Sequence, residues 1–149
     1  MIIMISDDLE VIMDIVIFGA NGQTGHLLTE QALAAGHRVV AATRRPDDFP
    51  LSDPKLTVAA VDVHDGAAVT EVVTGAQAVL STLGVSFTRE PVNTYSVGTG
   101  NIVAAMQASG VWRLAVVSST GRLEVFVREG NAQAALGLGR GAPVVVKRG

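Results

Sequence analysis

Three glycines stand at spacings of three residues in the segment Gly19-Ala20-Asn21-Gly22-Gln23-Thr24-Gly25, directly after the apolar run 15–18. Glycines at these positions let the backbone turn tightly, approach a pyrophosphate without interference from a Cβ atom, and bring a following helix close to the strand. The free N–H groups and the positive dipole end of that helix would then meet the anion. The spacing therefore predicts the phosphate-binding turn of a nucleotide-binding α/β unit.

Two other interpretations of the glycine segment are weaker. A flexible surface loop is the first, but a β-branched strand precedes the turn, and a helical pattern follows it and stops at Gly36, with apolar residues at Leu27, Leu28, Ala32 and Leu33. A P-loop is the second, and it is disfavoured because residue 26 is His and no Gly-Lys-Ser/Thr sequence follows the first glycine. The flanking residues favour dinucleotide binding.

The rest of the chain alternates short apolar runs with segments of helical period. Asp65 is a candidate N-cap, and the segment 44–54 is rich in Asp and Pro and is expected to form a loop without a full crossover helix. With right-handed crossovers, this order predicts an α/β fold of the Rossmann type, a doubly wound, mostly parallel sheet of about five to six strands. We expect strands near 14–18, 39–43, 56–61, 78–83 and 114–118, and helices near 22–35, 65–74 and 92–109.

Ligands of such sheets bind at the carboxyl ends of the strands, so the residues that follow each strand are the candidate site residues. An NAD-preferring fold normally has an acidic residue at the end of its second strand, but this chain has Thr43, Arg44 and Arg45 there. A guanidinium group attracts a 2′-phosphate, so we predict NADP(H) over NAD(H). A solvated Arg pair beside Asp47 and Asp48 is the alternative.

The other strand ends carry weaker signals. Asp62 and Val63 are candidates for the adenine, because a carboxylate accepts from its amino group, although an ordinary loop Asp is the alternative. Gly84 after Leu83 leaves room for a ligand against the backbone, although it could equally be a turn residue. The hydroxyl-bearing pair 118–119 ends the fifth strand, although it is equally typical of a turn.

The third predicted helix repeats apolar residues at helical period, and the stripe is expected to be buried: Tyr95, Thr99, Ile102, Val103 and Met106. Tyr95 is therefore expected to pack in the core or at its rim, with a catalytic role as the less favoured alternative. Thr99 stands four residues after it, so the Tyr/Lys acid pair that moves a proton in carbonyl reduction is not found there. This disfavours an epimerase or a dehydratase.

Composition limits the alternatives. The chain has 149 residues, of which 48% are hydrophobic, a formal charge of −3 and no cysteine, which fits a single α/β domain without disulfides or thiolate metal sites. The three histidines show no ligand spacing, so no metal is expected. No run reaches the length of a membrane span, no signal peptide is evident, and the short basic tail lacks interleaved aromatic residues. We expect a cytoplasmic protein that binds neither membranes nor nucleic acid.

The segments that carry these signals resemble a known family. IVIFGANGQTG, AATRRPDD, VDVHD, AVLSTLGV and GTGNIVAAMQASGV followed by RLAVVSS are similar to the NmrA-like, atypical short-chain dehydrogenase/reductase group of NAD(P)H-binding proteins. Within that group they resemble NADPH-dependent flavin reductases that also reduce biliverdin-IXβ. The resemblance covers about residues 13 to 120. Asn21 departs from the Thr that the family usually has in the turn.

The resemblance implies a role for each matching residue. The pyrophosphate would be held by the turn, the 2′-phosphate by Arg44 with Arg45 beside it, and the adenine by Asp62 and Val63. Leu83 and Gly84 would lie along the ribose and nicotinamide, and Ser119 would lie beside the nicotinamide as the candidate catalytic residue. The turn residues so implied are Gly19, Asn21, Gly22, Gln23, Thr24 and Gly25. The protein would hold a planar acceptor, such as a flavin or a tetrapyrrole, against NADPH, which supplies the hydride.

The two ends of the chain depart from the resemblance. We interpret residues 1–12 as an extension or as a misassigned start, with Met13 as the alternative first residue, and residues 13–120 as the NAD(P)-binding domain. Residues 121–149 contain six of the sixteen glycines and five Lys/Arg against two Asp/Glu. Either the protein is a short variant of the family, in which 142–147 adds an edge strand, or these residues are the tail of a truncated or frame-shifted product. In both cases we expect the substrate lobe to be incomplete. Two alternatives to the reductase follow: a nonenzymatic NADP-sensing module with a protein partner, and a truncated product that binds cofactor with little activity.

Overall fold

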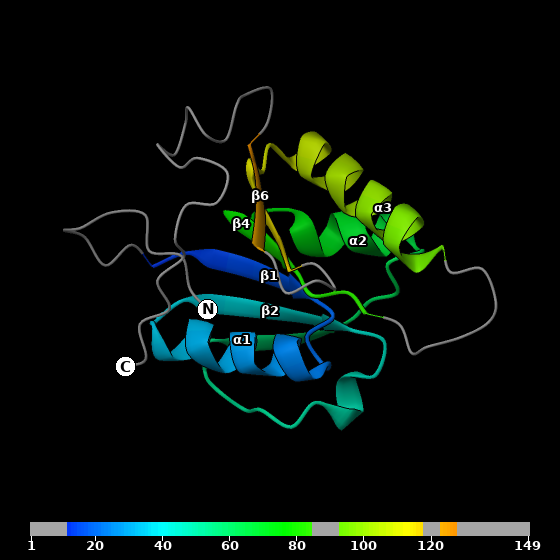
Figure 1. Ribbon diagram of the computed structural model, residues 1–149. Helices are drawn as coiled ribbons and strands as arrows, with labels where there is room; N and C mark the ends of the chain where they lie inside the picture. The colour runs from blue at the N-terminus through cyan, green and yellow to red at the C-terminus, as the bar shows by residue number, and fades with distance from the viewer. Residues whose placement is uncertain (1–11, 85–92, 118–122, 128–149) are drawn as a thin grey trace.

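The protein is built around one six-stranded sheet with helices on both faces. The structure is a computed structural model, and it describes residues 12–84, 93–117 and 123–127. Its elements follow in the order β1 (Asp14–Phe18), α1 (Gln23–Ala34), β2 (Arg38–Thr43), the 3₁₀ helix η1 (Pro46–Asp48), β3 (Leu56–Ala60), α2 (Gly66–Val73), β4 (Ala78–Ser81), α3 (Thr94–Ser109), β5 (Arg113–Val117) and β6 (Leu123–Val127). Figure 1 shows α1 on one side of β1 and β2, and α2 and α3 on the other.

The strands lie in the order β3-β2-β1-β4-β5-β6. The first five are parallel, with Ile15 of β1 between Val39 of β2 and Ala78 of β4, and β6 pairs antiparallel with β5. The chain builds outward from β1 in one direction and then returns to build outward in the other. The reversal between β1 and β4 is a topological switch point, and its carboxyl end is where such sheets bind ligands. The predicted doubly wound Rossmann-type sheet is confirmed.

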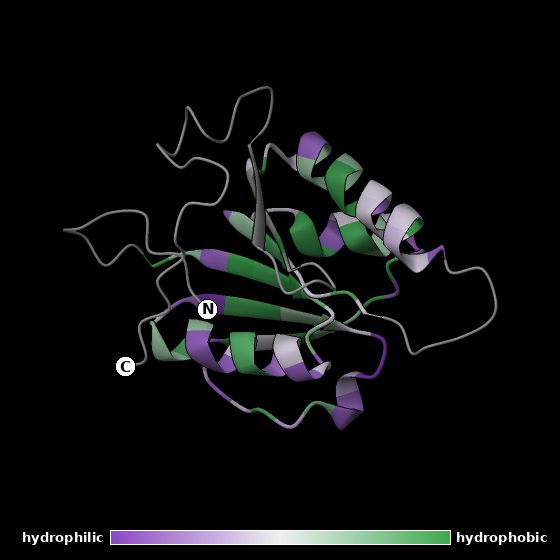
Figure 2. Ribbon diagram, viewed as in Figure 1, coloured by the Kyte–Doolittle hydropathy of each residue, from purple (hydrophilic) through white to green (hydrophobic). Residues whose placement is uncertain are grey.

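Alternating side chains of the central strand enter two separate cores. Val16 and Phe18 of β1 are buried on the side of α2 and α3, whereas Ile15 and Ile17 are buried on the side of α1. A strand covered on both faces reads as a continuous apolar run, which is the pattern that the sequence shows in this segment. Figure 2 shows β1 and β2 as apolar along most of their length.

Local signals end and begin the helices as the sequence predicted. Gly36 follows α1 with a φ of 87°, and Gly110 follows α3 with a φ of 68°, a conformation that glycine adopts without steric cost. Asp65 precedes α2 in an extended conformation, and its Oδ1 accepts hydrogen bonds from the N–H groups of Ala67 (3.0 Å) and Ala68 (3.2 Å). The segment between β2 and β3 contains only the three-residue helix η1, so the predicted lack of a crossover helix is confirmed.

Replacing Asp65 with alanine should lower the free energy of unfolding by about 1 kcal/mol, because two N–H groups at the start of α2 lose their acceptor. Chemical denaturation followed by circular dichroism measures the effect. Asp65→Asn is the matched control, since its side-chain oxygen can accept the same bonds. An alanine variant that unfolds at the wild-type denaturant concentration would show that this cap does not stabilise the chain.

The predicted buried stripe of α3 is partly wrong. The residues that face the core are Gly98, Ile102, Ala105 and Met106, whereas the Tyr95 side chain is 44% exposed and Val103 is 37% exposed. A Cβ atom at Gly98 would lie only 2.9 Å from Cγ2 of Val63, so α3 approaches the loop after β3 too closely for a large side chain. The predicted stripe therefore shares Ile102 and Met106 with the observed contact face, whereas its other residues are exposed.

Strand β6 was not predicted from the sequence. It covers Leu123–Val127 and lies at the edge of the sheet beside β5. The edge strand suggested at 142–147 lies outside the described residues, as does all of the proposed extension at 1–12 except its last residue. No helix in the described ranges has the length and apolar character that crossing a bilayer requires.

Candidate functional site

The glycine turn connects the carboxyl end of β1 to the first turn of α1. Gly19 has a φ of 75°, its carbonyl oxygen accepts a hydrogen bond of 3.0 Å from the N–H of Gly22, and Gly22 stands in an extended conformation before the helix. No side chain caps the start of α1. The N-terminal N–H groups of this helix are therefore left to another acceptor, which is the arrangement of an anion site.

The three glycines are needed for different reasons. A Cβ atom at Gly19 would lie 2.7 Å from the carbonyl oxygen of Thr82, so β1 and the segment after β4 touch through backbone at this point. A Cβ atom at Gly25 would overlap the Gly19 carbonyl oxygen and lie 2.7 Å from Cα of Ala20, so the helix crosses directly over the turn. Gly22 is exposed, and its Cβ would approach only the Gly19 oxygen, at 3.3 Å. Glycine at 19 and 25 shapes the turn, and glycine at 22 keeps its outer surface open.

Thr82 fixes the turn to the neighbouring strand, and it was not among the residues predicted from the sequence. Its N–H donates to the Phe18 carbonyl at 2.9 Å, and its hydroxyl donates to the carbonyls of Phe18 (3.0 Å) and Gly19 (3.2 Å). These bonds satisfy backbone acceptors where β1 ends and the chain leaves the sheet. The available signal was a threonine between an apolar strand and the predicted Leu83-Gly84 segment.

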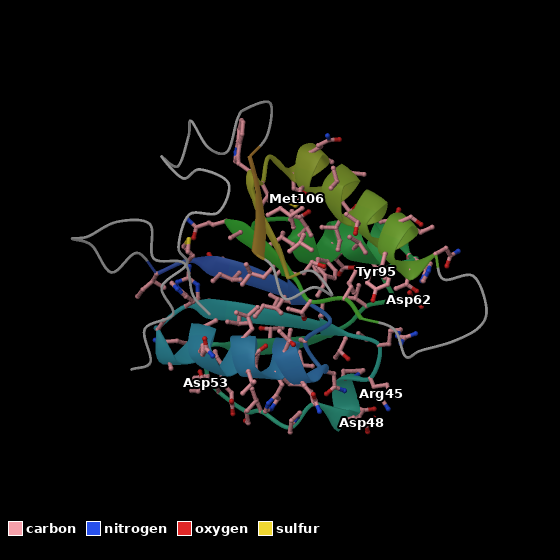
Figure 3. The ribbon with its side chains drawn as sticks, viewed as in Figure 1. Arg45, Asp48, Asp53, Asp62, Tyr95 and Met106 are labelled. Atoms are coloured by element: carbon pink, nitrogen blue, oxygen red, sulfur yellow. The ribbon has the colours of Figure 1, made fainter. Side chains whose placement is uncertain are left out.

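The end of β2 presents the two arginines differently. Thr43 is buried and its hydroxyl accepts from the N–H of Arg45 at 3.2 Å, whereas both arginine side chains are exposed. Arg45 forms an ion pair of 3.6 Å with Asp48 in η1, which Figure 3 shows beside it at this end of the sheet. Arg44 instead lies near enough to Asp62 for its charge to act on that carboxylate. The loop thus offers Arg44 for an external anion, while Arg45 already has a partner.

The loop after β2 also packs against the start of α1. The rings of His26 and Phe49 meet edge to face, with their centroids 6.2 Å apart. The Nε2 atom of His26 is buried and has no hydrogen-bond partner among the described residues. This contact holds the segment that carries Arg44 next to the helix whose N-terminus follows the glycine turn.

The end of β3 carries a charged group whose state is set by its neighbours. Oδ1 of Asp62 accepts from the backbone N–H of His64 and contacts its Nδ1, each at 2.9 Å. These bonds from His64, and then the positive charge of Arg44, lower the pKa of the Asp62 carboxyl below its ordinary value. Asp62 is therefore a carboxylate at neutral pH, an acceptor without a proton to donate. It is exposed at the same end of the sheet as Tyr95 (Figure 3).

Of the remaining predicted residues, some lie in the core, some are exposed at the surface, and one lies outside the described residues. Val63 is 7% exposed and packs beside Gly98, so its side chain belongs to the core. Leu83 is partly buried on the same core, and Gly84 is exposed with open space around it. The candidate catalytic residue Ser119 lies outside the described residues. In the turn, Gln23 and Thr24 are exposed and Asn21 is half-buried.

The structure therefore brings most of the predicted binding residues to one edge, formed by the ends of β1, β2, β3 and β4. A separate open hollow of about 320 Å³ lies at the opposite, amino end of the strands, beside the bidentate ion pair of Asp14 with Arg38 (2.5 and 2.7 Å). It is distant from the glycine turn by the length of the sheet. Within the described ranges, no three His, Asp or Glu side chains gather as metal ligands.

Comparisons with known proteins agree with this geometry. A family model described as NAD(P)H-binding matches residues 19–136. The chain belongs to this NAD(P)H-binding family. A sequence relative from Mycobacterium tuberculosis, an uncharacterised protein, is 36% identical over 108 residues, which are 72% of this chain and 12% of that protein.

Solved structures place the fold among Rossmann-type NAD(P)-binding proteins. A putative epimerase from Bacteroides thetaiotaomicron is 29% identical with a TM-score of 0.62, over 72% of this chain and 48% of that one. Uronate dehydrogenase from Agrobacterium tumefaciens is 25% identical with a TM-score of 0.61, over 72% of this chain and 41% of that one. This chain thus spans less than half of either structure and about an eighth of the mycobacterial relative.

Proposed function

We propose that the chain binds NADPH at the carboxyl edge of its sheet and serves hydride transfer to a planar acceptor such as a flavin or a tetrapyrrole. The observation that carries the cofactor half is the exposed Arg44 at the end of β2, where an NAD-preferring site would have a carboxylate. The acceptor half is supported by the resemblance of the strand-end segments to flavin reductases.

Each part of the edge has a distinct task in this proposal. The uncapped N–H groups at the start of α1 bind the pyrophosphate, and the open outer surface of Gly22 allows the phosphate to approach the backbone. Arg44 pairs with the 2′-phosphate, which selects NADPH over NADH. Asp62 accepts from the adenine amino group, while Val63 contributes backbone only because its side chain is in the core.

NADPH supplies the hydride when it is bound, so the chain's contribution to the reaction is to bind and orient two planar rings. The segment after β4 suits this role. Leu83 gives an apolar wall that is fixed against the core, and the space around Gly84 leaves room for a ring system along the backbone. Ser119 remains the proposed residue beside the nicotinamide.

The test is a titration of the purified chain with NADPH and with NADH, followed by addition of FMN or biliverdin. Trp112 directly precedes β5 and so lies at the amino end of the sheet, which makes the fluorescence of the reduced nicotinamide the better reporter of binding. We expect tighter binding of NADPH than of NADH, and acceptor-dependent loss of nicotinamide absorbance. A chain that binds neither nucleotide would overturn the proposal. Binding without turnover over a panel of flavins and tetrapyrroles would instead favour the NADP-sensing module.

A further inference from the structure

His64 joins two elements of the edge that are distant in sequence. Its Nδ1 lies 2.9 Å from Oδ1 of Asp62, at the end of β3, and its Nε2 lies 3.3 Å from Oδ1 of Asn93, the residue before α3. The imidazole therefore lies between Asp62 and Asn93, with one ring nitrogen facing each residue. Because Asp62 is ionised, Nδ1 must carry the proton of the first bond.

The backbone of this loop is fixed without the imidazole. The N–H of Asp65 donates to the Asp62 carbonyl at 2.9 Å, and Nδ2 of Asn101 in α3 donates to the Val63 carbonyl at 2.8 Å. The side chain of Val63 is buried below the loop. What the His64 ring adds is the orientation of the Asp62 side chain, which is otherwise half exposed to solvent.

The two oxygens of the Asp62 carboxylate differ in their hydrogen bonds. Oδ1 receives both bonds from His64, from the backbone N–H and from the ring. Within the described part of the chain, Oδ2 accepts no hydrogen bond, so one oriented acceptor remains on an exposed edge. An oriented carboxylate oxygen forms a hydrogen bond with an N–H donor and repels a carbonyl oxygen. It can therefore discriminate a purine with a 6-amino group from one with a 6-oxo group.

We propose that His64 is a positioning residue that aims Asp62 at the 6-amino group of the cofactor's purine, and so makes the site selective for a 6-aminopurine over a 6-oxopurine nucleotide. The inference rests on the proposed NADPH site. In this proposal His64 does not touch the nucleotide; its ring donates to Asp62 from one side and lies beside Asn93 at the start of α3. Selectivity at the base is thus separate from the selectivity for the 2′-phosphate that Arg44 provides.

The experiment compares the dissociation constants of NADPH and of its deamino analogue, which carries hypoxanthine in place of adenine, for the full chain and its variants. A hydrogen bond to a charged group contributes about 1.5 to 3 kcal/mol, so wild type should prefer NADPH by roughly tenfold or more. Asp62→Asn should abolish or reverse the preference, because its amide can donate to the 6-oxo group. His64→Ala should reduce it to about twofold to threefold by releasing the carboxylate. His64→Asn should retain most of it, because its amide nitrogen can take the place of Nδ1.

Asn101→Ala is the matched control for loop structure. It removes the bond to the Val63 carbonyl but leaves both bonds to Asp62, so affinity for the two nucleotides should fall together while their ratio stays constant. If the His64→Ala variant keeps the wild-type preference for the adenine nucleotide, the positioning role of His64 is overturned, while the assignment of Asp62 to the adenine stands. Equal binding of the two nucleotides by wild type would overturn the assignment of Asp62 to the adenine. Binding of neither would overturn the NADPH site itself, and this inference with it.

Discussion

Gly19→Ala is expected to destabilise the chain by about 2 to 5 kcal/mol and to abolish nucleotide binding. Two independent costs combine at this residue. Its φ of 75° lies in the left-handed region, and its Cβ atom would lie 2.7 Å from the Thr82 carbonyl oxygen and 3.0 Å from the N atom of Leu83. Both neighbours are backbone of the segment after β4, so neither can turn away as a side chain would. The turn and that segment would have to separate.

Gly100→Ala is the matched control for this prediction. Gly100 lies within α3, a Cβ atom added there would meet nothing within 4 Å, and its φ is not positive. Alanine there should stabilise the helix by up to about 1 kcal/mol. Thermal unfolding and NADPH titration of both variants measure the contrast. A Gly19→Ala chain with wild-type stability and affinity would mean that the turn is not locked against Thr82.

Arg44→Glu is expected to weaken NADPH binding by about a hundredfold while leaving NADH binding within about threefold of wild type. The substitution removes a charge-assisted partner of the 2′-phosphate and places a like charge near it. NADH has a ribose hydroxyl at that position, from which a carboxylate can accept a hydrogen bond. The ratio of the two dissociation constants, measured on the same preparation, is the readout.

Arg45→Glu is the comparison that identifies which arginine faces the phosphate. Arg45 is paired with Asp48 at 3.6 Å, so its replacement should change the ratio by less than about tenfold. An Arg44→Glu chain that loses affinity for both nucleotides equally would contradict the phosphate assignment. A larger effect at Arg45 than at Arg44 would transfer the role to the paired residue.

Local patterns in the sequence were sufficient for much of the fold. The strand predicted at 14–18 agrees with β1 as observed, and the helix ends at Gly36 and Gly110 and the cap at Asp65 are as expected. These features depend on residues within a few positions of one another, on backbone freedom at glycine and on a side chain that reaches its own helix. Such information is present in any short stretch of the chain.

Features that depend on distant segments were missed or misplaced. The contact face of α3 was misjudged because Gly98, which has no side chain to mark it as apolar, is the residue that lies against Val63. Strand β6 was not predicted because its place at the sheet edge depends on pairing with β5. Thr82 was missed because its partners, Phe18 and Gly19, lie 64 and 63 residues away in the sequence.

The sequence by itself determined the glycine turn, the strand-helix alternation around it, and the presence of arginine in place of a carboxylate at the end of β2. The tertiary structure decided what those residues face. Placing β4 beside β1 makes Thr82 the neighbour of Gly19, and the loops after β2 and β3 bring Arg44 within electrostatic reach of Asp62. The physical reason is that turns and caps are set by nearby residues, whereas a binding edge is assembled from strand ends that only the sheet order brings together.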